Sequence, residues 1–86
     1  MQYRQASDVL SRAVPGYLTL AKPDGTVIEV HGPGADVWQA IDQPVELDQL
    51  VDVLADRFAT DRGTVFEDVR RLLVELEAGG YVTNDG

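Results

Sequence analysis

The chain has 86 residues, a formal net charge of −8 and no cysteine. This length suits a single domain, expected over residues 1–86, and the lack of cysteine excludes disulfides and thiolate metal sites. The acidic charge disfavours nucleic acid and anionic membranes as partners, because both bind proteins largely through Lys and Arg.

The amino-terminal residues carry no recognisable targeting signal. Residues 1–5 contain no basic stretch followed by a long apolar run, and no later segment is long and apolar enough to span a membrane. The absence of cysteine fits a reducing compartment. We therefore expect a cytoplasmic protein that has no membrane partner.

The front half of the chain is predicted to form strands. A short strand is expected at residues 9–13, before a break at residues 14–16. Residues 17–21 and 26–30 are rich in side chains that suit a pleated sheet, and the Lys-Pro-Asp-Gly segment between them suits a tight turn. These two segments predict a β-hairpin.

The back half of the chain is predicted to form helices. After a Gly-Pro-Gly break at residues 32–34, the spacing of apolar residues predicts helices over residues 35–41 and 47–59. A third helix is expected to begin within residues 61–64. Strands followed by helices predict an α+β fold.

Both ends of the last helix carry capping signals. Thr64 and Glu67 match a capping box, in which the Thr side chain accepts a hydrogen bond from a free backbone amide; Asp61 is an alternative cap. Gly79 is placed where a left-handed residue commonly ends a helix. We expect the helix to end there and residues 81–82 to follow as a short extended piece.

Strand alternation and helical spacing converge on one predicted core. The apolar stripe of the last helix is wider than one small sheet needs, which leaves one edge of the stripe available for a peptide. The predicted core residues are Leu18, Leu20, Ile28, Val30, Trp38, Ile41, Leu50, Val51, Leu54, Phe58, Val69, Leu73 and Leu76.

No group of residues in the sequence suits catalysis. His31 is the one histidine and follows a predicted strand, so without cysteine a zinc site is disfavoured. Ser7 and Ser11 have no local base, and residues 32–34 lack the Lys and following hydroxyl of a phosphate loop. We expect no enzymatic activity, no metal and no cofactor.

The apolar positions form a pattern that covers nearly the whole chain, from about residue 9 to residue 82. The residues that carry it are Gly34 to Ile41 with Trp38, Val45 to Val51, Phe58, Asp68-Val69, Leu72-Leu73, Leu76 and Gly80-Tyr81-Val82. This pattern resembles the PqqD-like family, which consists of small modules known as RiPP recognition elements. Many members carry a Leu-Asn pair where this chain has Val-His-Gly at residues 30–32.

The resemblance implies both a fold and a function. The implied fold is α+β and similar to a winged helix-turn-helix, with a three-stranded antiparallel sheet followed by three helices. The implied function is non-catalytic: such modules bind the leader region of a ribosomally synthesised precursor peptide. They then deliver it to a leader peptidase or other modifying enzyme, and for standalone members we favour the leader peptidase of lasso peptide pathways.

The implied site lies along the third strand and the last helix, where the leader adds as a further strand. An edge strand offers unpaired backbone groups, and side-chain pockets at alternate positions give selectivity. The sequence allows either face of the strand to meet the helix. The expected peptide-binding residues are Thr26, Val27, Ile28, Glu29 and Val30 on the strand and Val65, Asp68, Val69, Arg71, Leu72, Glu75 and Leu76 on the helix.

Two other functions share the same predicted fold. A winged-helix DNA-binding regulator is disfavoured, because the acidic residues of the last helix would repel phosphate. An interaction subunit of another complex would use an apolar strand edge equally well. Titration with duplex DNA tests the first of these, and size-exclusion chromatography with and without a leader peptide tests the second.

Overall fold

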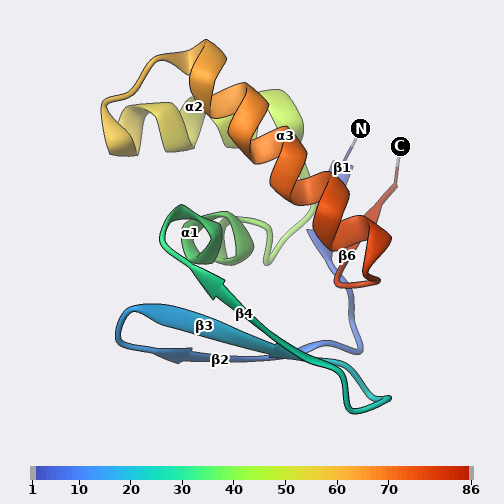
Figure 1. The fold of residues 1–86 in the computed structure, drawn as a ribbon. Helices are drawn as coiled ribbons and strands as arrows, with labels where there is room; N and C mark the ends of the chain where they lie inside the picture. Colours follow the sequence, from blue (N-terminus) through green and yellow to red (C-terminus); the bar gives the residue numbers. More distant parts are fainter. Residues whose placement is uncertain (1, 86) are drawn as a thin grey trace.

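The computed structural model describes residues 2–85 and confirms the α+β prediction, with antiparallel strands and three helices (Figure 1). The elements, in chain order, are β1 (Gln2–Gln5), β2 (Leu10–Val14), β3 (Tyr17–Ala21), β4 (Val27–His31), α1 (Pro33–Ala40), β5 (Val45–Glu46), α2 (Leu47–Phe58), α3 (Arg62–Ala78) and β6 (Val82–Asn84). The predicted antiparallel sheet is formed by β2, β3 and β4, and the three predicted helices follow it.

The predicted hairpin forms between β3 and β4, with Ala21 opposite Val27. Lys22 N donates to Thr26 O at 2.9 Å, and Gly25 adopts a φ of 91°, which glycine tolerates well. Thr26 N donates to Asp24 Oδ1 at 2.8 Å, which keeps Thr26 in the turn. The strand therefore begins one residue later than the predicted segment 26–30.

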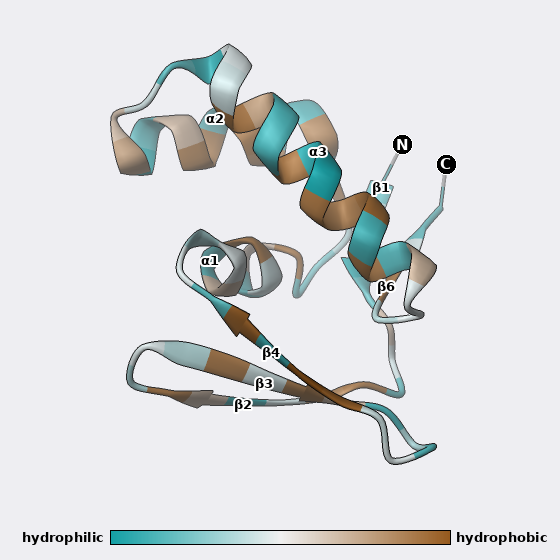
Figure 2. Cartoon of the chain, viewed as in Figure 1, coloured by the Kyte–Doolittle hydropathy of each residue, from teal (hydrophilic) through white to brown (hydrophobic). Residues whose placement is uncertain are grey.

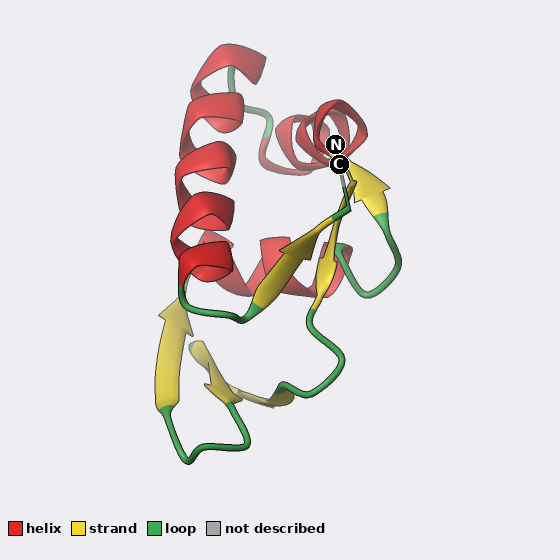
Figure 3. Ribbon diagram, turned by 90° about the vertical axis from the view of Figure 1, so that its right-hand side faces the viewer, coloured by secondary structure: helices red, strands yellow, loops and turns green. Residues whose placement is uncertain are grey.

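A second sheet, in the order β5-β1-β6, is absent from the sequence prediction. Its central strand β1 is mostly polar, and Tyr3 is its one buried aromatic residue. Tyr3 lies opposite Val45 on one side and Asn84 on the other. Figure 3 shows the two ends of the described chain side by side in this sheet, away from the β3–β4 hairpin.

Of the predicted caps of α3, the alternative N-cap Asp61 is confirmed, whereas the Thr64 capping box and the left-handed Gly79 are wrong. Asp61 is the N-cap, because its side chain accepts a hydrogen bond from Thr64 N at 3.0 Å; Thr64 lies inside the first turn. At the other end, Gly79 has a right-handed φ of −83°, while Gly80 takes the left-handed value of 83°. Gly79 N still donates to Glu75 O, so the chain reverses one residue later than expected.

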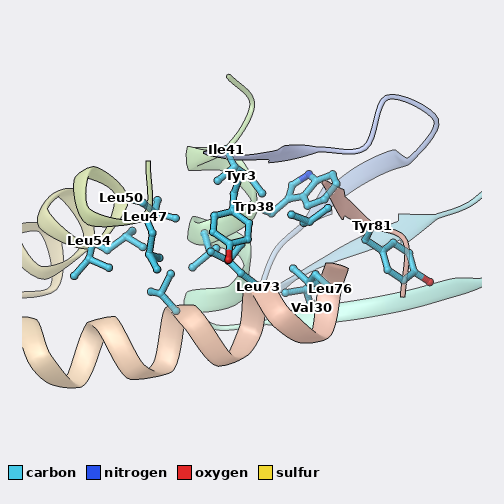
Figure 4. Packing of buried hydrophobic residues seen from close by; sticks show 14 of the residues in the cluster. Tyr3, Val30, Trp38, Ile41, Leu47, Leu50, Leu54, Leu73, Leu76 and Tyr81 are labelled. Carbon is cyan, nitrogen blue, oxygen red and sulfur yellow. The ribbon is translucent and has the colours of Figure 1, made fainter. Parts of the chain in front are cut away.

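The buried side chains form one cluster that joins the helices to both sheets (Figure 4). Every predicted core residue is buried except Ile28, which is half-buried, and Phe58, which is 39% exposed. Ile28 lies on an edge strand, and Phe58 is the last residue of α2, so neither is covered on all sides. Figure 2 shows hydrophobic residues along most of β4 and in bands along α3. The core residues that the prediction omitted are Tyr3, Ala6, Val37, Leu47, Val65, Tyr81 and Val82.

Candidate functional site

The open edge of β4 is the first part of the site. β4 stands at the end of the sheet order, and within residues 2–85 it pairs with β3 alone. In Figure 3, β4 lies below the C-terminal end of α3, with its outer edge facing away from β2 and β3. Such an edge presents backbone N–H and C=O groups that another extended chain can complete.

The alternation of hydrogen bonds along β4 decides which backbone groups are open. Lys22 and Thr26 oppose each other, and the bond from Lys22 N to Thr26 O makes them a hydrogen-bonded pair. Hydrogen-bonded and non-bonded pairs alternate in an antiparallel ladder, so Ile28 and Val30 bond to β3. The positions whose N–H and C=O groups face the open edge are therefore Val27, Glu29 and His31.

The side chains of β4 alternate between the two faces of the sheet. Val30 is buried and Ile28 is half-buried, whereas Val27 is 57% exposed and Glu29 is exposed. The face that carries Ile28 and Val30 is thus the one that meets the helices. The sequence alone allowed either face of this strand to meet the last helix.

A groove of about 430 Å³ lies between β4 and the C-terminal half of α3. Val30, Leu76 and Tyr81 are buried beside it, Leu72 is half-buried, and Glu75 is exposed. The groove is therefore apolar at its base and acidic at its rim. Its lining residues are Ile28, Glu29, Val30, His31, Gly34, Leu72, Glu75, Leu76 and Tyr81.

Gly34, in the first turn of α1, lets three elements meet at the base of the groove. A β-carbon at this position would overlap the Val30 side chain and lie 3.5 Å from Leu72 Cδ2. α1 therefore approaches β4 and α3 more closely than any residue with a side chain would allow. We conclude that the shape of the groove depends on glycine at this position.

Tyr81 forms one end of the groove, just after the reversal at Gly80. Its backbone is fixed on both sides: Tyr81 N donates to Leu76 O at 2.9 Å, and Ala6 N donates to Tyr81 O at 3.0 Å. The Nζ atom of Lys22 lies 5.1 Å from the centre of the Tyr81 ring. Sequence reasoning expected only an extended piece here, since the Gly-Gly-Tyr order does not reveal that the ring turns inward.

Glu29 and His31 lie on the face of β4 opposite Ile28 and Val30, and their side chains offer little that suits catalysis. His31 Nε2 and Glu29 Oε1 lie 3.2 Å apart, and the rings of His31 and Tyr17 are 5.3 Å apart at their centres. Within residues 2–85, no group of three or more His, Cys, Asp or Glu side chains could hold a metal ion. The same part of the chain has no helix with the length and hydrophobicity needed to cross a membrane.

The predicted site residues of α3 divide into two groups. Leu72, Glu75 and Leu76 line the groove beside β4. Val65, Asp68 and Val69 line a different hollow of about 300 Å³, together with residues of α1 and α2. The apolar stripe is shared because the first part of α3 packs on α2 and only the last part lies over β4.

Three further predicted residues are exposed and outside the groove lining. Val27 lies at the open edge of β4, and Thr26 lies in the turn before it. Arg71 is exposed on α3, one residue before Leu72. None of these three residues therefore reaches the base of the groove.

Comparisons with known proteins agree with the fold and the pattern of apolar residues. The family model for coenzyme PQQ synthesis protein D, PqqD, matches residues 16–82. A solved structure of TbiB1 in complex with the TbiA(beta) leader peptide has a TM-score of 0.85, covering 96% of this chain and 98% of that chain at 20% identity. Outer-membrane lipoprotein LolB of Bordetella petrii is 36% identical over 69 residues, which represent 78% of this chain. The chain spans 35% of the length of that relative.

Proposed function

The chain belongs to the PqqD family, and on this premise we propose that it binds the leader region of a ribosomally synthesised precursor peptide. The observation that carries the proposal is the open edge of β4 beside an apolar groove. TbiB1, whose fold is the same over nearly its whole chain, was solved with a leader peptide. Both facts support the sequence-based expectation of a peptide-binding module.

We expect the leader to add as an antiparallel strand next to β4. The open backbone groups at Val27, Glu29 and His31 supply its ladder, and a segment of about five to eight residues matches the strand. Side chains on one face of the added strand then enter the groove, because successive side chains of a strand alternate. Those on the other face stay in solvent beside Val27 and Glu29.

The apolar groove adds affinity that the backbone hydrogen bonds of the added strand alone do not provide. A leader segment that is disordered when free must be ordered on binding, and this ordering opposes affinity. Leu72 is only half-buried in the free protein, so a peptide side chain packed on it removes further apolar area from water. Affinity is therefore expected to depend on one or two apolar anchors, while Arg71 and Glu75 act at the rim.

We further propose that the bound leader is delivered to a modifying enzyme, with a leader peptidase of the lasso peptide type as the favoured partner. Holding a substrate close to an enzyme raises its effective concentration without adding catalytic groups. The groove offers an extended chain a place to bind and no nucleophile with an oriented base. Because the precursor is made by ribosomes, we place this activity in the cytoplasm.

Titration with the leader of a candidate precursor peptide tests the proposal, and amide exchange locates the contact. Val27, Glu29 and His31 should gain protection when the leader is present. Ile28 and Val30 should change less because β3 already holds their amides, and the turn at Gly25 should not change. Absence of binding, or protection confined to another surface, would contradict the proposed function.

A further inference from the structure

Lys22 joins the β3–β4 hairpin to the C-terminal end of α3. It is the one lysine of the chain and directly follows β3, and its Nζ atom donates to Gly79 O at 2.7 Å. Within residues 2–85, no other hydrogen bond connects the hairpin with α3 or with the reversal at Gly80. In Figure 1 the hairpin turn and the C-terminal end of α3 lie on the same side of the molecule.

The C-terminal end of α3 needs a cation from another element. The last carbonyl groups of a helix have no donor within the helix, and they carry a partial negative charge. The last turn of α3 contains Glu75 and Glu77 but no basic residue. Lys22 supplies both the donor and the positive charge. Because Lys22 is half-buried, solvent screens this contact less than it screens an exposed one.

The same contact positions the residues that form one end of the groove. Lys22 Nζ lies 5.1 Å from the centre of the Tyr81 ring, and Tyr81 N donates to Leu76 O. Tyr81 and Leu76 line the groove, whereas Lys22 does not. Elsewhere along the groove, α1 meets β4 and α3 at Gly34. The separation between α3 and β4 is therefore set by close packing at Gly34 and by the Lys22 contact at the end of α3.

We propose that Lys22 is a positioning residue, which holds the C-terminal end of α3 to the hairpin and keeps the groove at the width that a bound strand requires. This inference rests on the proposed function and adds the residue that preforms the site. Without the contact, the end of α3 moves relative to β4, and the groove is correctly formed in only a fraction of the molecules. The apparent Kd rises in inverse proportion to that fraction.

Lys22→Met tests this role, because methionine keeps an unbranched apolar stem and removes the charge and the donor. Arg62→Met is the matched control. Arg62 Nε donates to Asp52 Oδ1 at 2.6 Å and joins α3 to α2, and Arg62 does not line the groove. Each variant thus loses one positive charge and one link between elements. The probe is a peptide selected on the wild-type chain from a phage-displayed library of random sequences, and chosen because it protects the β4 amides from exchange.

Lys22→Met should bind this peptide about 3- to 10-fold more weakly than wild type, if about a tenth to a third of its molecules keep the groove formed. Arg62→Met should bind as wild type does. Stopped-flow kinetics should place the loss for Lys22→Met in the association rate and leave the dissociation rate near that of wild type, because Lys22 does not touch the peptide.

Amide exchange in the free protein separates this local effect from a general loss of stability. The amide of Tyr81, which donates to Leu76 O, should exchange faster in Lys22→Met than in wild type. The amide of Val65, at the other end of α3, should exchange at the wild-type rate. A general destabilisation of the fold would accelerate both.

Several outcomes would overturn the role of Lys22 and leave the proposed function standing. These are wild-type affinity for Lys22→Met, an equal loss for Arg62→Met, and an equal acceleration of exchange at Tyr81 and Val65. A loss confined to the dissociation rate would show that Lys22 contacts the peptide itself, which also overturns the positioning role. If no selected peptide protects β4 in the wild-type chain, the proposed function fails, and the role of Lys22 in binding fails with it.

Discussion

Replacing Leu72 by alanine should weaken peptide binding more than it weakens the fold, and Leu73 provides the matched control one residue away. Leu73 is 0% exposed, so Leu73→Ala should cost about 3–5 kcal/mol of unfolding free energy. The total free energy of unfolding of an 86-residue domain is about 4–13 kcal/mol, so the cost of Leu73→Ala is a large share of it. Leu72 is half-buried and should cost about 1–2 kcal/mol in the free protein.

The binding loss for Leu72→Ala follows from the apolar surface that only the bound peptide covers. If that surface contributes a further 1–2 kcal/mol or so, affinity should fall about 5- to 30-fold. Leu73 does not line the groove, so Leu73→Ala should bind nearly as well as wild type while it remains folded.

Urea unfolding, followed by the fluorescence of Trp38, the one tryptophan, measures the free energy of unfolding. Calorimetric titration with the leader measures the binding affinity. Binding should be measured well below the unfolding midpoint of each variant. Wild-type affinity for Leu72→Ala would show that the peptide does not use this groove. Equal destabilisation by the two changes would show that Leu72 belongs to the core.

Three further predictions follow from the same site. Arg71→Glu should weaken leader binding less than Leu72→Ala, and its effect should shrink at high salt because Arg71 is exposed; titrations at two salt concentrations decide this. Proline scanned through the contacting leader segment should lower affinity at every second position, and a period near four would indicate a bound helix instead. Hydrogen bonds from the Thr26 backbone and side chain lower the pKa of the Asp24 carboxyl below its ordinary value. The carboxylate therefore stabilises the fold above about pH 4 and loses this effect as the pH falls further, so the stability difference between wild type and Asp24→Asn should shrink in acid unfolding measurements.

Local signals in the sequence were sufficient for most of the fold. The Pro-Asp-Gly turn predicted the β3–β4 hairpin, and the repeat of apolar residues predicted α2 and α3 to within a few residues. The second sheet escaped prediction because β1 is polar and its partners are far away in the sequence. A strand of this kind is defined by its pairing and by Tyr3, not by an alternating pattern of its own.

The candidate site could be predicted only in outline. The resemblance to the PqqD-like family implied that β4 and α3 would lie together, as they do. Periodicity cannot show which stretch of a helix packs on which element, so Val65 and Val69 were grouped with Leu72 although they face α2. The position of Tyr81 in the groove depends on the turn at Gly80, which sequence reasoning placed one residue earlier.

The open edge of β4 also bears on whether two copies of the chain can pair with each other. Two copies that joined antiparallel through this edge, centred on the middle of Val27–His31, would place Glu29 directly opposite its own copy. Like charges opposed across a strand pair are destabilising, and charged residues are a common protection of exposed edges. Glu29 therefore disfavours self-association in this register, whereas a ligand strand with a neutral or basic residue opposite Glu29 avoids the repulsion.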